Sequence, residues 1–169
     1  LEQNTTASYN TALGYFSLED NQTGEKNTGV GSFALEATTS GNNTAVGFNS
    51  LRLNTSGTEN VAVGANALDA ATTADHNTAV GHNSLTTNTT GSENTAVGQG
   101  SLGSNTTGAN NTGLGYGALV LNSTASNNTA IGYNALATNT TGNSNVAIGT
   151  NASDASQTAS QGVAIGFGA

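Results

Sequence analysis

The stretch Asn128-Thr-Ala-Ile-Gly-Tyr-Asn-Ala-Leu136, with its continuation Ala137-Thr-Asn-Thr-Thr-Gly142, is one complete unit of a repeat that fills the chain. The unit holds a short apolar run, a glycine, a leucine four residues later and a polar Asn-Thr-Thr-Gly turn. A fixed repeat period is typical of architectures in which each unit contacts only its neighbours. The fold therefore depends on how one such unit is shaped and stacked.

The repeat period is 17 residues, with one step of 16 residues from Gly31 to Gly47. We expect the missing residue in the turn after Gly41, because turns tolerate changes of length best. Coil units begin near residues 10, 27, 43, 60, 77, 94, 111, 128, 145 and 162. The glycine that closes the apolar run recurs at Gly14, Gly31, Gly47, Gly64, Gly81, Gly98, Gly115, Gly132, Gly149 and Gly166.

The residue types of the unit favour a β-solenoid. Seventeen residues rich in Thr, Asn and Gly make a poor helix, and coiled-coil heptads are absent. The unit suits one coil made of two short strands and two turns. We expect an all-β, parallel β-roll of about ten coils that forms one repeat domain over residues 1–169.

The apolar positions of the unit predict which side chains face the coil interior. Alternate residues of a strand point to opposite faces. The second motif position is Thr or Val and the fourth is Val, Leu or Ile. We expect both of these columns inside the coil, together with the leucine column at Leu18, Leu35, Leu51, Leu68, Leu85, Leu102, Leu119 and Leu136.

The third motif position holds only Ala or Gly and therefore points the other way. A solvated position would accept any polar residue, so strict smallness indicates that another backbone lies close. We expect a partner chain or a second layer at this column. The predicted oligomer contacts are Ala12, Ala45, Ala62, Ala79, Ala96, Ala130, Ala147 and Ala164.

Two columns of asparagine predict amide ladders. Identical side chains stacked one coil apart, about 4.8 Å, can hydrogen-bond along the stack. The first ladder opens the motif at Asn10, Asn27, Asn43, Asn60, Asn77, Asn94, Asn111, Asn128 and Asn145. The second opens the polar turn at Asn21, Asn54, Asn88, Asn105, Asn122 and Asn139.

The composition excludes several classes of partner. The formal net charge is −8, and Lys26 and Arg52 are the only basic residues besides the two histidines. Nucleic acids and anionic membranes would find few cations here, so we expect neither as a partner. No apolar run is long enough to span a membrane, and zero cysteines exclude disulfides and thiolate chemistry.

No constellation of residues predicts catalysis, a cofactor or a metal site. His76 and His82 flank one motif without a repeating third ligand, and Asp75 and Asp154 fall in variable turns. We therefore expect no enzymatic activity. The column after the motif glycine varies freely, which makes it the candidate ligand-facing strip: Tyr15, Phe48, His82, Tyr116 and Tyr133.

The repeat also generates Asn-x-Thr or Asn-x-Ser sequons. Glycosylation of these sites would need a secreted setting and the right transferase. The sequons include Asn4, Asn21, Asn42, Asn54, Asn88, Asn105, Asn110, Asn122, Asn127 and Asn139.

The motifs Asn145-Val-Ala-Ile-Gly149 and Gly162-Val-Ala-Ile-Gly-Phe-Gly-Ala169 resemble the head repeats of YadA-like trimeric autotransporter adhesins. The longer unit at residues 77–91 resembles repeats of bacteriophage tail-fibre-type proteins. The resemblance implies a left-handed β-roll in which three chains pack side by side about a fibre axis, on a cell surface or a virion. The 17-residue unit exceeds the adhesin head repeat, so we expect a larger outer turn.

We expect a structural and adhesive segment of an extracellular homotrimeric fibre, with a host-surface glycan or protein as its ligand. Joining Ala169 to Leu1 would continue the repeat, so head-to-tail stacking into filaments is a further prediction. The alternative is an ice- or surface-binding β-solenoid, since threonine ladders can match a lattice. Burial of the motif threonines, which alternate with valine, would argue against that alternative.

Overall fold

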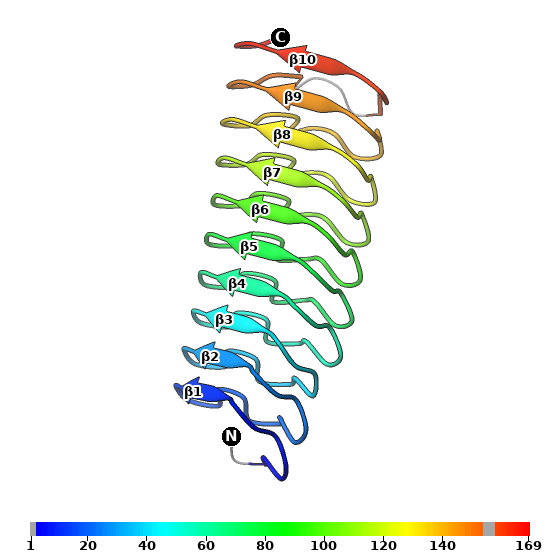
Figure 1. Cartoon of the computed structure of the whole chain (residues 1–169). Helices are drawn as coiled ribbons and strands as arrows, with labels where there is room; N and C mark the ends of the chain where they lie inside the picture. Colours follow the sequence, from blue (N-terminus) through cyan, green and yellow to red (C-terminus); the bar gives the residue numbers. More distant parts are fainter. Residues whose placement is uncertain (1–2, 154–157) are drawn as a thin grey trace.

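The computed structural model describes residues 3–153 and 158–169, and these residues form a β-solenoid. The strands stack in chain order in one parallel sheet, so the predicted all-β solenoid with coils of about 17 residues is confirmed (Figure 1). Within the described ranges no helix is long and apolar enough to cross a membrane. The strands are β1 (Thr11–Leu13), β2 (Thr28–Val30), β3 (Thr44–Val46), β4 (Val61–Val63), β5 (Thr78–Val80), β6 (Thr95–Val97), β7 (Thr112–Leu114), β8 (Thr129–Ile131), β9 (Val146–Ile148) and β10 (Val163–Ile165).

The sheet register follows the repeat, and the shorter coil is absorbed between β2 and β3. Thr28 pairs with Thr44, a separation of 16 residues. The hydroxyl of Thr39 donates to the carbonyl of Thr55, so these two residues are equivalent. The carbonyl of Ser40 accepts from Asn27 Nδ2 as the carbonyl of Gly57 accepts from Asn43 Nδ2, so Ser40 is equivalent to Gly57, although Gly57 is two residues after Thr55. The missing residue therefore lies between Thr39 and Ser40, and not after Gly41 as the spacing had suggested.

Each strand is short because a glycine ends it. The β-branched residues of the motif favour extended backbone. The glycine that follows has a φ between 127° and 142°, a range that L side chains rarely adopt. A Cβ added to Gly64 would lie 2.6 Å from the carbonyl oxygen of Gly81 in the next coil. The glycines must therefore stack directly on one another.

The structure has one strand in each described coil, so the expectation of two is wrong. After the glycine, alternate residues adopt left-handed backbone, as in Asn83 (φ 55°) and Leu85 (φ 50°). Extended strands need negative φ. The remainder of the coil is consequently a series of turns, and asparagine or glycine at the first of these positions suits that conformation.

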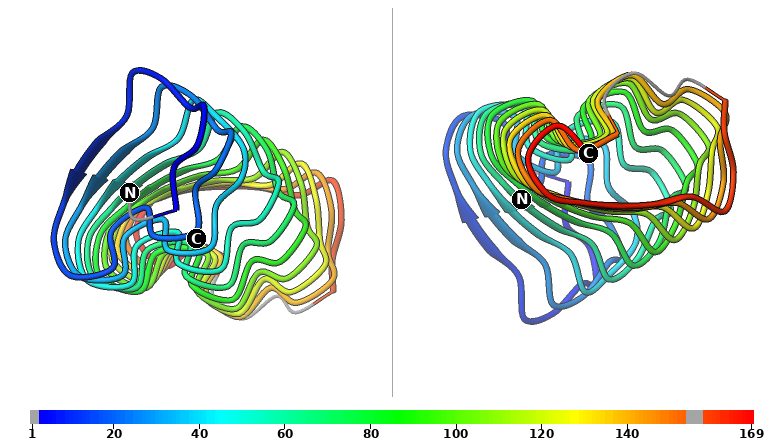
Figure 2. Two further views of the ribbon diagram at one scale, coloured as in Figure 1. Left: turned by 90° about the horizontal axis from the view of Figure 1, so that it is seen from below. Right: turned by 90° about the horizontal axis from the view of Figure 1, so that it is seen from above.

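The core of the solenoid is a narrow stack of leucine, alanine and serine. The leucine column is at most 1% exposed, which confirms its predicted place inside the coil. Buried serines bridge to the strand backbone, as when Ser84 Oγ donates to the carbonyl of Ala96 at 3.0 Å. Seen along the stack, successive coils superimpose with a gradual rotation (Figure 2).

Both predicted asparagine ladders are present. In the first, Asn94 Oδ1 accepts the backbone N–H of Asn111 at 3.0 Å, and Asn94 Nδ2 donates to the carbonyl of Gly108 at 2.9 Å. In the second, Asn105 Nδ2 donates to Asn88 Oδ1 at 2.9 Å. The second ladder is interrupted at Ala71, and Asn54 Oδ1 below it is buried without a hydrogen-bond partner among the described residues.

Candidate interaction surface

The alanine column lies inside the coil, opposite to its predicted position at an oligomer contact. Ala45, Ala62, Ala79, Ala96, Ala130 and Ala147 are 0% exposed within a single chain, and Ala12 and Ala164 are half-buried. A Cβ at Gly29 in this column would lie 3.3 Å from Leu18 Cγ and 2.6 Å from Ser17 Oγ. The atoms that demand small residues therefore belong to the same chain, mainly to the preceding coil.

The first and third residues of each strand point outward, although both columns were expected inside. We call these side chains the Thr/Val face. It consists of Thr11, Thr28, Thr44, Val61, Thr78, Thr95, Thr112, Thr129, Val146 and Val163 in one column and of Leu13, Val30, Val46, Val63, Val80, Val97, Leu114, Ile131, Ile148 and Ile165 in the other.

The Thr/Val face is an exposed and largely apolar surface. Val63 in the middle of the stack is 36% exposed, and Leu114 is 45% exposed. Strands spaced about 4.8 Å apart make this face roughly 45 Å long. No charged side chain lies within it. A continuous exposed apolar surface of this kind usually marks a site that binds another molecule.

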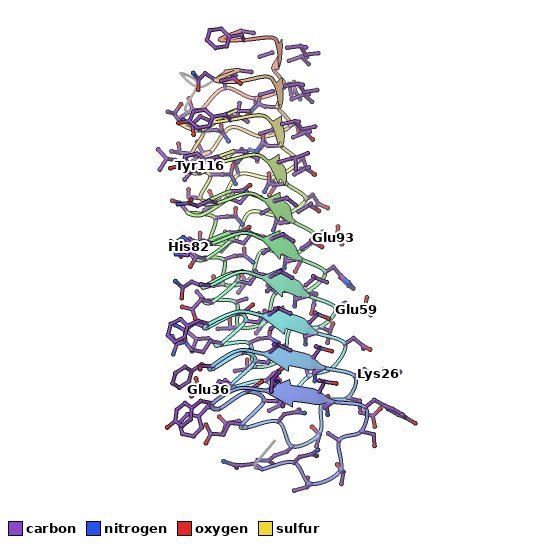
Figure 3. The ribbon with its side chains drawn as sticks, turned by 90° about the vertical axis from the view of Figure 1, so that its left-hand side faces the viewer. Lys26, Glu36, Glu59, His82, Glu93 and Tyr116 are labelled. Atoms are coloured by element: carbon purple, nitrogen blue, oxygen red, sulfur yellow. The ribbon has the colours of Figure 1, made fainter. Side chains whose placement is uncertain are left out.

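The turn after each strand carries the variable column predicted to face a ligand, which we call the aromatic edge. Tyr15 is 61% exposed, and Phe48, Tyr116 and Tyr133 are each 51% exposed. His82 is exposed and lies with Tyr116 on the same edge (Figure 3). The exposure of this column is confirmed, whereas its role in ligand binding stays a prediction.

Aromatic side chains on this edge contact one another along the stack. The rings of Tyr116 and Tyr133 lie 5.3 Å apart with an interplanar angle of 10°. Phe33 makes edge contacts with Tyr15 at 5.5 Å and with Phe48 at 6.0 Å. These contacts cover part of each ring and leave about half of the Phe48, Tyr116 and Tyr133 side chains exposed.

The turn before each strand forms the opposite edge, which carries charge. Lys26, Glu59 and Glu93 lie there, across the sheet from His82 and Tyr116 (Figure 3). His76 Nδ1 lies 3.2 Å from Glu59 Oε2, and both side chains are more than half exposed. Exposed pairs of this kind contribute little to stability.

The described residues hold no group of three or more His, Asp or Glu side chains that could bind a metal ion. His76 and His82 belong to opposite edges, since one precedes and the other follows β5. Asp75 accepts hydrogen bonds from the backbone N–H and the hydroxyl of Thr58, at 2.7 and 3.0 Å. Asp154 lies outside the described residues.

Sequence reasoning missed the Thr/Val face because it assigned the valine, isoleucine and leucine columns to the interior. A signal was available three residues after the motif glycine, where Ser84, Ser101, Ala118 and Ala135 are all small and buried. Small residues on both walls indicate an interior too narrow for valine on the strand. Among the described residues, the leucine column supplies the only large apolar side chains buried there.

Comparison of the chain with protein-family models, with curated protein sequences and with solved structures finds no match. A functional assignment must therefore be argued from the surface of the solenoid itself.

Proposed function

We propose that the chain is a non-enzymatic structural segment of an extracellular fibre, in which three copies pack side by side through their Thr/Val faces. The observation that carries this proposal is the unbroken outward row of threonine and aliphatic side chains over ten strands. A monomer would leave this row in water. The trimeric state and the phage or bacterial surface setting come from the resemblance to adhesin and tail-fibre repeats.

Strand geometry supports packing of copies through this face. Valine, isoleucine and threonine side chains project at regular intervals from a single parallel sheet. Two such faces can interdigitate as stacked sheets do, about 10 Å apart. Burying aliphatic side chains that are now partly exposed contributes about 25 cal/mol for each Å² removed from water.

Sedimentation velocity of the purified chain over a range of concentrations tests this proposal. The expected species is a trimer, and the double variant Val63→Lys/Val80→Lys is expected to shift it toward the monomer. Thr73→Lys/Thr90→Lys adds the same charge at exposed turn positions away from the strands and is expected to keep the trimer. A wild-type chain that stays monomeric at every concentration would overturn the proposal.

The second candidate function is binding to ice or another regular surface. The specific observation in its favour is that the motif threonines point outward in parallel register, as in the pairs Thr78–Thr95 and Thr112–Thr129. Their expected burial was the argument against this function, and that argument no longer stands. A lattice-binding face must be free, so thermal hysteresis above that of a control protein, found for a monomeric chain, would favour this candidate.

Ligand binding and end-to-end assembly are separate proposals. A host-surface glycan or protein would contact the aromatic edge, where Tyr116 and Tyr133 leave about half of their surface exposed.

Head-to-tail stacking would pair β10 of one copy with β1 of the next. Leu1, whose position suggested that continuation, lies outside the described residues. Electron microscopy that shows only single short particles would exclude filaments.

A further inference from the structure

Nine of the eleven sequons in the sequence fall into two structural classes. Six of them open the polar turn, and their asparagine side chains point into the coil with no exposure: Asn21, Asn54, Asn88, Asn105, Asn122 and Asn139. The Nδ2 of each donates to a carbonyl three residues on, as Asn88 does to Gly91 at 2.8 Å. A sugar on these nitrogens would have no space and would break the ladder.

The second class of sequons lies just before a strand, on the charged edge. Asn42, Asn110 and Asn127 are exposed and have φ values of 62°, 58° and 63°. No hydrogen bond to another described residue holds the side-chain amide of Asn110 or Asn127. These amides are therefore open to solvent and to an enzyme.

Because side chains alternate along the extended backbone, the threonine that completes each of these sequons also points outward. The middle residue is a buried ladder asparagine, such as Asn111 after Asn110. The third residue is the first strand threonine, such as Thr112, which belongs to the Thr/Val face. The acceptor amide and the hydroxyl that completes the sequon are thus both on the outer surface, with the buried residue between them.

We propose that Asn42, Asn110 and Asn127 are the acceptor sites for N-linked glycosylation in the folded chain, and that the six turn asparagines are not. In the reaction, Nδ2 attacks C1 of a sugar activated as a glycosyl diphosphate. The N–C1 bond forms as the bond from C1 to the diphosphate oxygen breaks, Nδ2 gives one proton to a base of the transferase, and the diphosphate leaves with the electron pair of the broken bond. The attached sugars project from the charged edge.

Two further sequons belong to neither class. Asn4 is exposed, but its Nδ2 donates to the carbonyl of Ala7 at 3.1 Å. Asn151, with Ser153 as the third residue, is half-buried in the turn after β9. The proposal is confined to the three sites that combine an open amide with an outward threonine.

The test uses a soluble asparagine glycosyltransferase that transfers one hexose from a nucleotide sugar to Asn-x-Ser/Thr. The folded full-length chain, at a concentration at which it is monomeric so that no other copy covers the strand threonines, and peptides released from it by proteolysis are incubated separately, and mass spectrometry maps the sites. We expect hexose on Asn42, Asn110 and Asn127 in the folded chain, and on the six turn sites only in the peptides. Modification of the turn sites in the folded chain, or none at Asn110 and Asn127, would overturn the proposal.

Matched variants sharpen this test. Glu93 and Ser144 occupy the same exposed column with φ values of 60° and 59°. Glu93→Asn creates a sequon with Thr95 and is expected to add a fourth site. Ser144→Asn creates none, because Val146 stands at the third position, and is expected to stay unmodified. Thr112→Val should remove the hexose from Asn110 alone, and Val61 and Val146 show that the same column accepts valine.

Discussion

The two sides of each strand can be compared directly, because they alternate along three residues. In β5, Ala79 faces inward and is fully buried, while Thr78 and Val80 face outward and are half-buried. The smaller side chain is thus the one inside, contrary to the rule that larger aliphatic residues occupy a core. The comparison teaches that the width of the interior, and not hydrophobicity alone, decides which face of a strand is buried.

The same comparison separates two meanings of a small-residue column. Strict Ala or Gly does indicate that other atoms lie close, and Leu18 and Ser17 do lie close to Gly29. It does not say whether those atoms belong to the same chain or to another chain. The Thr/Val face differs, since the coil interior does not restrict the size of its side chains and they stay partly exposed in a single chain.

The largest loss of stability is expected from removing a large side chain from the interior of the coil. Leu85→Ala removes a fully buried side chain from the leucine column and should lower the free energy of unfolding by about 2–5 kcal/mol. Val80→Ala on the outward side should change it by about 1 kcal/mol or less when both variants share one oligomeric state. Urea denaturation followed by circular dichroism measures both. Equal losses would contradict the assignment of the two sides.

The next largest loss of stability is expected from breaking the first asparagine ladder, which is buried. Asn94→Ala leaves the N–H of Asn111 and the carbonyl of Gly108 without their partner, which should cost at least about 1–3 kcal/mol in unfolding free energy. The control is Asn66→Gly, because Asn66 donates to Asn83 Oδ1 in a half-buried ladder that water can replace, and glycine suits its φ of 56°. We expect the control to lose clearly less stability in the same urea titration.

Overfilling the interior should produce an effect of similar or smaller size. Ala79→Leu forces a larger side chain into the narrow coil, and overpacking typically costs about 1–3 kcal/mol. Val80→Leu adds no strain on the outward side and should be nearly neutral. The melting temperatures of the two variants, measured by calorimetry, test this difference. A stable Ala79→Leu variant would show that the interior is wider than the structure indicates.

Sequence reasoning predicted the features that depend on the repeat itself. Coil length, parallel register, the buried leucine column and both asparagine ladders follow from spacing and from the hydrogen-bonding capacity of asparagine. The sequence could not show which of the Ala79 and Val80 columns points into the coil. The alternation of side chains along a strand shows only that the two columns point to opposite sides. The prediction of two strands per coil was wrong because Leu85 has a positive φ. Leucine normally avoids this conformation, so the sequence gives no sign of it.

The smallest effect is expected from repairing the interrupted second ladder. Asn54 Oδ1 lacks a partner where Ala71 replaces asparagine, so Ala71→Asn should supply a donor. A Cβ at Gly91 would lie 2.5 Å from Asn88 Oδ1, so Ala74 should crowd the new amide in the same way. The double variant Ala71→Asn/Ala74→Gly should therefore gain about 0.5–1.5 kcal/mol.

The single variant Ala71→Asn serves as the control for that repair. It should fold, since Asn122 and Ala125 coexist in a later coil with a 3.0 Å hydrogen bond between them. It should gain less stability than the double variant. A double variant less stable than the wild type in urea would contradict the role given to the interrupted ladder.

Thiol labelling tests the facing of the strand most directly, because the chain contains no cysteine of its own. Three single variants, Thr78→Cys, Ala79→Cys and Val80→Cys, are treated with a maleimide reagent under native conditions at a concentration where the chain is monomeric. We predict fast labelling at positions 78 and 80 and protection at position 79 until the protein is unfolded. Fast labelling at position 79, with protection at 78 and 80, would contradict the inward alanine column and with it the Thr/Val face.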